Sequence, residues 1–198
     1  MVANLTTLLR TLLSFVVAWV LYVTQPVDSI YIGMFVLTIV IIWMDGLDGF
    51  FARLFNECSK VGAMIDILGD RIVENVYWIT FAVLGWIPLW VPLVVLARGI
   101  VTDGIRSIAF EKGYTAFGSD SMQQSKLGKF IVSSNVCRFS YAVFKAIAFA
   151  MLILAHTPMF AENQVISLVA YSSMYIAVFF CVLRAIPVIA ESKRFFTE

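Results

Sequence analysis

Long apolar runs alternate with short polar stretches along the whole chain. A helix that spans a bilayer needs about 20 largely apolar residues. Segments that reach or approach this length are 8–24, 31–49, 66–86, 88–110, 130–155 and 164–189. The runs are continuous and do not alternate residue by residue, so the pattern predicts helices and not the strands of a membrane β-barrel. We expect an all-α integral membrane protein with six transmembrane helices.

Composition strengthens this prediction. Of the 198 residues 61% are hydrophobic, and the mean hydropathy is +0.92, whereas soluble domains are about 45–50% apolar. The net charge of +1 gives no broad basic surface, so no nucleic-acid partner is expected. The length fits a single membrane domain over residues 1–198.

The distribution of basic residues predicts the orientation in the membrane. The connections at 24–30, 85–88 and 156–164 contain no lysine or arginine. The opposite side carries Arg53, Lys60, Arg71, Lys112, Lys126, Lys129, Lys193 and Arg194. By the positive-inside rule that side is cytoplasmic, and both termini lie there. In a bacterium the membrane would be the cytoplasmic (inner) membrane.

Aspartates gather where the second predicted helix ends and the third begins. Asp45 and Asp48 are three residues apart and Asp66 and Asp70 are four apart, so each pair shares one helix face. Crowded carboxylates near a bilayer repel unless they are protonated or bind a divalent cation. Oxygen ligands suit Mg²⁺, Mn²⁺ or Ca²⁺ better than zinc. We therefore expect an active site with bound metal at the cytoplasmic ends of these two helices.

Glycines accompany the acidic residues. Gly46, Gly49 and Gly62 leave the backbone bare beside them. Because glycine destabilises a helix, these positions suggest close approach by a ligand. Arg53 follows Asp48 by five residues and could contact a phosphate or a carboxylate. The alternative is a set of ion-paired residues that cap two helices, but the acids outnumber the local bases.

The spacing of these residues resembles the signature of the CDP-alcohol phosphotransferase family, D-x-x-D-G-x-x-A-R, a short spacer and G-x-x-x-D-x-x-x-D. Residues 45–53 and 62–70 match every fixed position. Near the N-terminus, Asn4, Thr7 and Arg10 resemble an opening segment of that family, N-x-x-T-x-x-R. The resemblance covers most of the chain. It also implies six helices, cytoplasmic termini and a motif shared by the second and third helices.

The resemblance implies a role for each matched position. Two Mg²⁺ or Mn²⁺ ions would be bound by Asp45, Asp48, Asp66 and Asp70. Asp70 would also act as the catalytic base. The nucleotide would be held by Gly49, Ala52, Arg53 and Gly62. The implied partners are CDP-diacylglycerol as donor, membrane lipid and a second copy of the chain in a homodimer.

Basic residues within the last three predicted helices point to an anionic acceptor. Buried cations are costly and normally face a polar cavity, and arginine suits bidentate recognition of phosphate. The candidates for an acceptor-phosphate site are Arg98, Arg106, Lys129, Arg138 and Arg184. Asp103 could pair with Arg98 or Arg106. We expect a phosphorylated acceptor, with snorkelling or structural pairing as the alternative for these arginines.

Within the family, the basic positions resemble those of phosphatidylglycerophosphate synthases. The matching residues are Ala97, Arg98, Arg106, Gly128 and Lys129. This resemblance implies transfer of a phosphatidyl group from CDP-diacylglycerol to sn-glycerol 3-phosphate, giving phosphatidylglycerophosphate and CMP, as a step in phospholipid biosynthesis.

The sequence also departs from those synthases. Ile67 and Arg71 stand where they commonly have proline and lysine, and Asp70-Arg71 looks more like relatives that use inositol phosphate. Another phosphorylated polyol therefore stays open as acceptor. A protein of another class, a transporter that uses the acids as a divalent-cation or proton site, is the remaining alternative.

Overall fold

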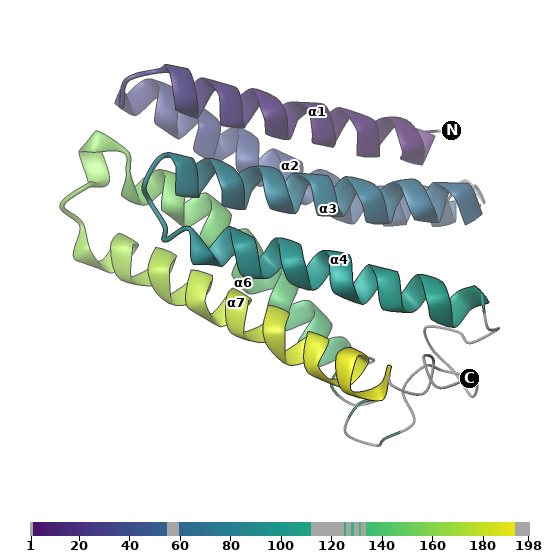
Figure 1. Cartoon of the computed structure of the whole chain (residues 1–198). Coiled ribbons are helices and arrows are strands. Elements are labelled where there is room, and N and C mark those ends of the chain that lie inside the picture. The colour runs from purple at the N-terminus through teal and green to yellow at the C-terminus, as the bar shows by residue number, and fades with distance from the viewer. Residues whose placement is uncertain are drawn as a thin grey trace. The chain divides into compact units, whose positions relative to one another are not determined.

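The computed structural model describes residues 2–54, 60–111, 125, 128, 131 and 134–192 (Figure 1). All regular structure in these ranges is helical, which confirms the all-α prediction. The helices are α1 (Val2–Val23), α2 (Asp28–Leu54), α3 (Lys60–Val83), α4 (Trp90–Glu111), α6 (Asn135–Ala155), the 3₁₀ helix η1 (Pro158–Phe160) and α7 (Gln164–Glu191).

Two helices extend past the apolar runs at their polar ends. The helices are longer than the predicted spans 31–49 and 66–86, because α2 continues to Leu54 and α3 already begins at Lys60. Hydropathy marks the length that suits lipid, whereas a helix continues as long as its backbone hydrogen bonds are satisfied. Asp45, Asp66 and Asp70 consequently lie inside helical turns, where neighbouring turns fix their spacing.

Four helical segments in the described residues are long and apolar enough to cross a membrane: Leu5–Val23, Asp28–Gly46, Val136–Ala155 and Gln164–Glu191. This supports an integral membrane protein. Helices α3 and α4 are also long enough to cross a membrane, but each carries several charged side chains along its length. The count of six spans therefore stays a prediction, as does the orientation of the termini.

The chain divides into two compact units, which are described separately. Unit 1 contains residues 1–92 and 146–172, and unit 2 contains residues 93–145 and 173–198. The boundaries fall within α4, α6 and α7. The prediction of a single domain over the whole chain stays a prediction.

Aromatic packing forms the core of unit 1. Helix α1 lies against both α2 and α3 (Figure 1). On α3, Tyr77 is buried, stacks on Phe149 of α6 with ring centroids 4.6 Å apart, and donates a hydrogen bond to Thr38 Oγ1 of α2 at 2.9 Å. Trp78 meets the same Phe149 ring edge-on at 4.8 Å. This core fixes α3 against its neighbours, so the residues earlier on α3 have a defined position.

Unit 2 has a smaller core between α4 and α7. Ile105 and Ala109 are buried together with Val188. Phe144 of α6 stacks on Phe180 of α7 with ring centroids 6.4 Å apart. These contacts hold the parts of α4, α6 and α7 that carry the basic residues singled out from the sequence.

Candidate functional site

Helices α1 and α3 approach each other closely at a glycine. Gly69 is buried on α3, and a Cβ atom there would lie 2.5 Å from Thr7 Cγ2, 3.4 Å from Thr11 Oγ1 and 3.7 Å from an Arg10 terminal nitrogen. Carbon atoms in contact prefer separations of about 3.5–4.0 Å. Only glycine therefore fits without a shift of the Thr7 side chain or of α1, and the close approach brings the side chain of Arg10 to the acidic residues of α3.

Arg10 contacts three of the predicted metal ligands. One terminal nitrogen pairs with Asp45 and lies 2.7 Å from Asp70 Oδ1, and the other donates to Asp66 Oδ1 at 2.9 Å. The Arg10 side chain is 3% exposed, whereas the three carboxylates are 45–50% exposed. The cation is thus covered by protein, and the carboxylates also face outward.

The three carboxylates meet two requirements for binding a divalent cation, namely proximity and ligand type. One oxygen from each of Asp45, Asp66 and Asp70 lies within 4.8 Å of the others. All three donors are hard oxygens, the ligand type that Mg²⁺ and Mn²⁺ prefer. The arginine among them shows that the geometry already accommodates positive charge. The described residues therefore fit such an ion, and the sequence spacing correctly predicted that these acids would come together.

The side chains of several predicted site residues are not among those that the structure describes. The backbone of α2 includes Asp48, Gly49, Ala52 and Arg53, but their side chains are outside the described residues, and so is Lys129. Gly62 lies in the first turn of α3, one turn before Asp66. The predicted roles of these residues stay predictions.

Arg71, which departs from the synthase pattern, has an acidic neighbour. Its NH1 lies 3.7 Å from Glu74 Oε2, one turn along α3. Glu74 is almost completely buried, while Arg71 is partly exposed. A buried carboxylate needs a counter-charge, and Arg71 provides one. Arg71 therefore follows Asp70 in the sequence and also contributes to the structure by pairing with Glu74.

Basic residues also meet in unit 2. Arg98 Nε donates to Cys181 Sγ at 3.0 Å, and the Arg98 guanidinium lies 5.5 Å from the centre of the Tyr141 ring. The Lys145 ammonium lies at the same distance from that ring. These contacts stabilise cations within a helical unit.

Arg184 is central to this group. Arg98, Arg106 and Arg138 are all close enough to repel its charge electrostatically. Among the described residues, the buried Nε of Arg184 has no hydrogen-bond partner. Arg106 pairs with Asp103 at 3.6 Å, which confirms that Asp103 can pair with one of the α4 arginines. An arrangement of like charges with a buried donor is suited to binding an anion.

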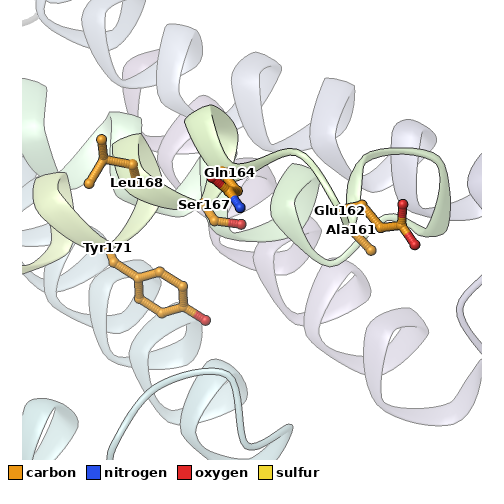
Figure 2. A pocket seen from close by; sticks show the side chains of 6 residues that line it. All are labelled: Ala161, Glu162, Gln164, Ser167, Leu168 and Tyr171. Carbon is orange, nitrogen blue, oxygen red and sulfur yellow. The ribbon is translucent and has the colours of Figure 1, made fainter.

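A pocket at the other end of α3 lies apart from the carboxylates. It has a volume of about 340 Å³ and is lined by Ala161, Glu162, Gln164, Ser167, Leu168 and Tyr171 (Figure 2). The Tyr171 hydroxyl donates to the Trp86 carbonyl at 3.2 Å, just beyond the end of α3. Its lining is mostly apolar and brings together no set of catalytic groups.

Arg10 is the site residue whose role the sequence reasoning missed. The opening segment that contains it was recognised, but no contact was assigned to it. The available signal was an arginine followed directly by the apolar run 11–23. A cation in such a helix needs a partner or a polar cavity, although this signal does not identify the partner.

The sequence was also compared with known proteins. The model of a family described as CDP-alcohol phosphatidyltransferase matches residues 1–183. The match covers all the aspartates singled out above and most of the basic residues of unit 2.

Individual relatives match over shorter segments. A "CDP-diacylglycerol--glycerol-3-phosphate 3-phosphatidyltransferase" of Mycoplasma genitalium is 33% identical over 84 residues, 42% of this chain and 35% of the relative. A protein of the same name from Aquifex aeolicus is 37% identical over 71 residues, 36% of this chain and 37% of the relative. A Mycobacterium bovis protein provisionally named cardiolipin synthase is 33% identical over 72 residues, 36% of this chain and 34% of the relative. The matched segments thus span about a third of each relative's length.

Proposed function

Because the chain belongs to the CDP-alcohol phosphatidyltransferase family, we propose that it transfers a phosphatidyl group from CDP-diacylglycerol to sn-glycerol 3-phosphate. The products would be phosphatidylglycerophosphate and CMP, a step in phospholipid biosynthesis. The names of the Mycoplasma genitalium and Aquifex aeolicus relatives support this choice of acceptor. Another phosphorylated polyol, such as inositol phosphate, is the alternative acceptor.

The observation that carries the proposal is the meeting of Asp45, Asp66 and Asp70 around Arg10. We assign these three carboxylates and Asp48 as ligands of two Mg²⁺ or Mn²⁺ ions. When bound, such ions would supply positive charge that stabilises the diphosphate and the departing nucleotide. The family signature supports binding of the nucleotide by Gly49, Ala52, Arg53 and Gly62.

The proposed reaction is a phosphoryl-type displacement. An acceptor hydroxyl oxygen forms a bond to the phosphorus that carries the diacylglycerol. The bond from that phosphorus to the bridging oxygen breaks, and CMP leaves with the electron pair. Asp70 takes the proton of the acceptor hydroxyl, the role of a general base. Asp70 is 45% exposed, so a proton can pass from it to water afterwards.

We assign the acceptor phosphate to the basic residues of unit 2. Support comes from Arg184, whose buried Nε has no hydrogen-bond partner among the described residues and whose charge is repelled by three other arginines. A bound phosphate would relieve this repulsion and accept hydrogen bonds. The proposed phosphate ligands are Arg98, Arg106, Lys129, Arg138 and Arg184.

The same account covers the placement in the membrane. We propose six spans, with α3 and α4 as spans whose charged residues serve the site. Both termini would be cytoplasmic, since Lys and Arg are absent from the connections on the other side. In a bacterium this would be the inner membrane. The family resemblance also suggests a homodimer.

An acceptor comparison tests the proposal. Purified protein in detergent is given CDP-diacylglycerol, Mg²⁺ or Mn²⁺, and either sn-glycerol 3-phosphate, inositol phosphate, glycerol or phosphatidylglycerol. We expect the highest kcat/KM for CMP release with sn-glycerol 3-phosphate. A clear preference for glycerol would contradict the assignment of a phosphate site. Formation of cardiolipin from phosphatidylglycerol would instead favour the activity named for the Mycobacterium bovis relative. The transporter alternative predicts no CMP release with any acceptor.

A further inference from the structure

The opening segment of the chain contributes to the carboxylate cluster although the proposed reaction gives it no role. Arg10 comes from α1, whereas Asp45 belongs to α2 and Asp66 and Asp70 belong to α3. Its guanidinium touches all three acids, with separations of 2.7 Å to Asp70 and 2.9 Å to Asp66. The cluster is therefore assembled from three helices, and Arg10 is the contact common to all of its described acids.

Burial makes this contact energetically significant. The Arg10 side chain is 3% exposed, and a buried charge without a partner is costly. The carboxylates need Arg10 equally, because their oxygens lie within 4.8 Å of one another and like charges at that distance repel. Each partner makes the position of the other tolerable.

Arg10 and a divalent cation would both be attracted by the same carboxylates. The carboxylate oxygens that the guanidinium contacts belong to the residues assigned above as metal ligands. A metal ion among these ligands would lie within a few ångströms of the guanidinium and would be repelled by it. The carboxylates' partial exposure leaves them accessible to an ion from outside.

We propose that Arg10 is an internal counter-ion of the metal-binding carboxylates: it holds them together in the metal-free chain and competes electrostatically with divalent cations. This inference rests on the metal site proposed above. Arg10 is a positioning residue in this account. It sets how tightly the site binds metal, and it takes no part in bond formation.

The expected change in metal affinity on removing Arg10 can be calculated from its charge. Removing a unit charge about 4 Å from a divalent ion changes its affinity on the order of 30-fold, even with the dielectric constant of water. Some of this gain is lost because the carboxylates are less well ordered without Arg10. We therefore expect Arg10→Gln to bind a divalent cation about tenfold more tightly than the wild type.

The test measures Mn²⁺ binding directly. EDTA-treated wild type, Arg10→Gln and Lys145→Gln are titrated with Mn²⁺ at low ionic strength, and free Mn²⁺ is followed by electron paramagnetic resonance. Lys145→Gln also removes one positive charge, but its ammonium lies over the Tyr141 ring in unit 2. This variant therefore shows how much of any change in Mn²⁺ affinity comes from the altered net charge of the chain. Thermal unfolding should show that metal-free Arg10→Gln is less stable than the wild type and gains more stability from Mn²⁺.

The outcomes separate the two proposals. Mn²⁺ binding by the wild type with no tightening in Arg10→Gln overturns the counter-ion role and leaves the metal site intact. A loss of stability that is the same with and without Mn²⁺ also overturns it, because it shows a purely structural contact. If neither chain binds Mn²⁺, the proposed metal site fails together with the inference.

A second variant covers the case in which Arg10→Gln does not fold. Arg10→Lys keeps a positive charge but offers one ammonium where the guanidinium's two terminal nitrogens contact three acids. Its hold on the cluster should be weaker. Because the charge is retained, its Mn²⁺ affinity should stay within about threefold of the wild type. Tightening by about tenfold or more would overturn the inference, because it could not come from the loss of a charge.

Discussion

Replacing Gly69 by alanine tests whether the close approach of α1 and α3 builds the carboxylate cluster. The added Cβ would lie 2.5 Å from Thr7 Cγ2, about 1 Å closer than carbon atoms prefer. Because Thr7 is buried, we expect α1 to move away from α3 and to draw Arg10 from Asp66 and Asp70.

The expected cost combines two opposing terms. Overpacking in a well-packed interior typically costs about 1–3 kcal/mol. Replacing a glycine in a helix by alanine returns up to about 1 kcal/mol. The net loss should be about 1–2 kcal/mol, which for a chain of this length lowers the unfolding midpoint by about 2–8 °C.

The assay is thermal unfolding of the metal-free protein in detergent for a double-mutant cycle. Thr7→Ser removes the methyl carbon that the new Cβ would meet, so Gly69→Ala should cost at least about 1 kcal/mol less in the Thr7→Ser background. Gly33→Ala is the matched control, because Gly33 is also helical but has no neighbour within 4 Å of an added Cβ. It should be neutral or slightly stabilising.

Two results would refute this reasoning. One is a Gly69→Ala variant as stable as Gly33→Ala, which would show that the helices have room at this point. The other is an equal cost of Gly69→Ala in both backgrounds, which would remove Thr7 as the obstacle.

Other substitutions separate the roles of the remaining groups. Asp66→Asn removes a negative oxygen ligand with little change in volume, so CMP release should nearly disappear while the unfolding midpoint stays close to that of the wild type. EDTA should likewise silence the wild type, and Mn²⁺ should restore it. Asp70→Asn should lower kcat by about 10²–10⁴-fold, with a much smaller effect on CDP binding measured by calorimetry. Arg184→Gln should raise the KM for sn-glycerol 3-phosphate by about 10–100-fold, since a charged hydrogen bond contributes about 1.5–3 kcal/mol, and should leave the KM for CDP-diacylglycerol unchanged. Burial lowers the pKa of His156 below its ordinary 6.5, so the free energy of unfolding should fall as the pH drops from 6.5 through the folded-state pKa, and His156→Phe should flatten this dependence in thermal scans.

The helical class and the acidic cluster were accessible from the sequence because both depend on local spacing. Long apolar runs predicted helices, and positions 66 and 70 on one helix face predicted that their carboxylates would lie together. The helices extend past the predicted span ends at residues 49 and 66 for a physical reason. Hydropathy reports the segment that suits lipid, and the helices continue through polar turns beyond it.

Contacts between distant segments were not accessible in the same way. The partner of Arg10 depends on how α1 packs on α3, which is decided at Gly69 and Thr7. Similarly, Arg98 donates to Cys181, which lies 83 residues further along the chain. The sequence indicated that buried arginines need partners, but only the fold determines which side chains they meet.

The most direct measurement of the central claim is the stoichiometry of transfer by purified protein. Isotope-labelled sn-glycerol 3-phosphate, CDP-diacylglycerol and Mn²⁺ are incubated with the protein, and CMP and labelled lipid are quantified together by mass spectrometry. The account predicts one phosphatidylglycerophosphate for each CMP, and neither product in EDTA or with Asp66→Asn. CMP release without labelled lipid, or equal product formation in EDTA, would contradict it.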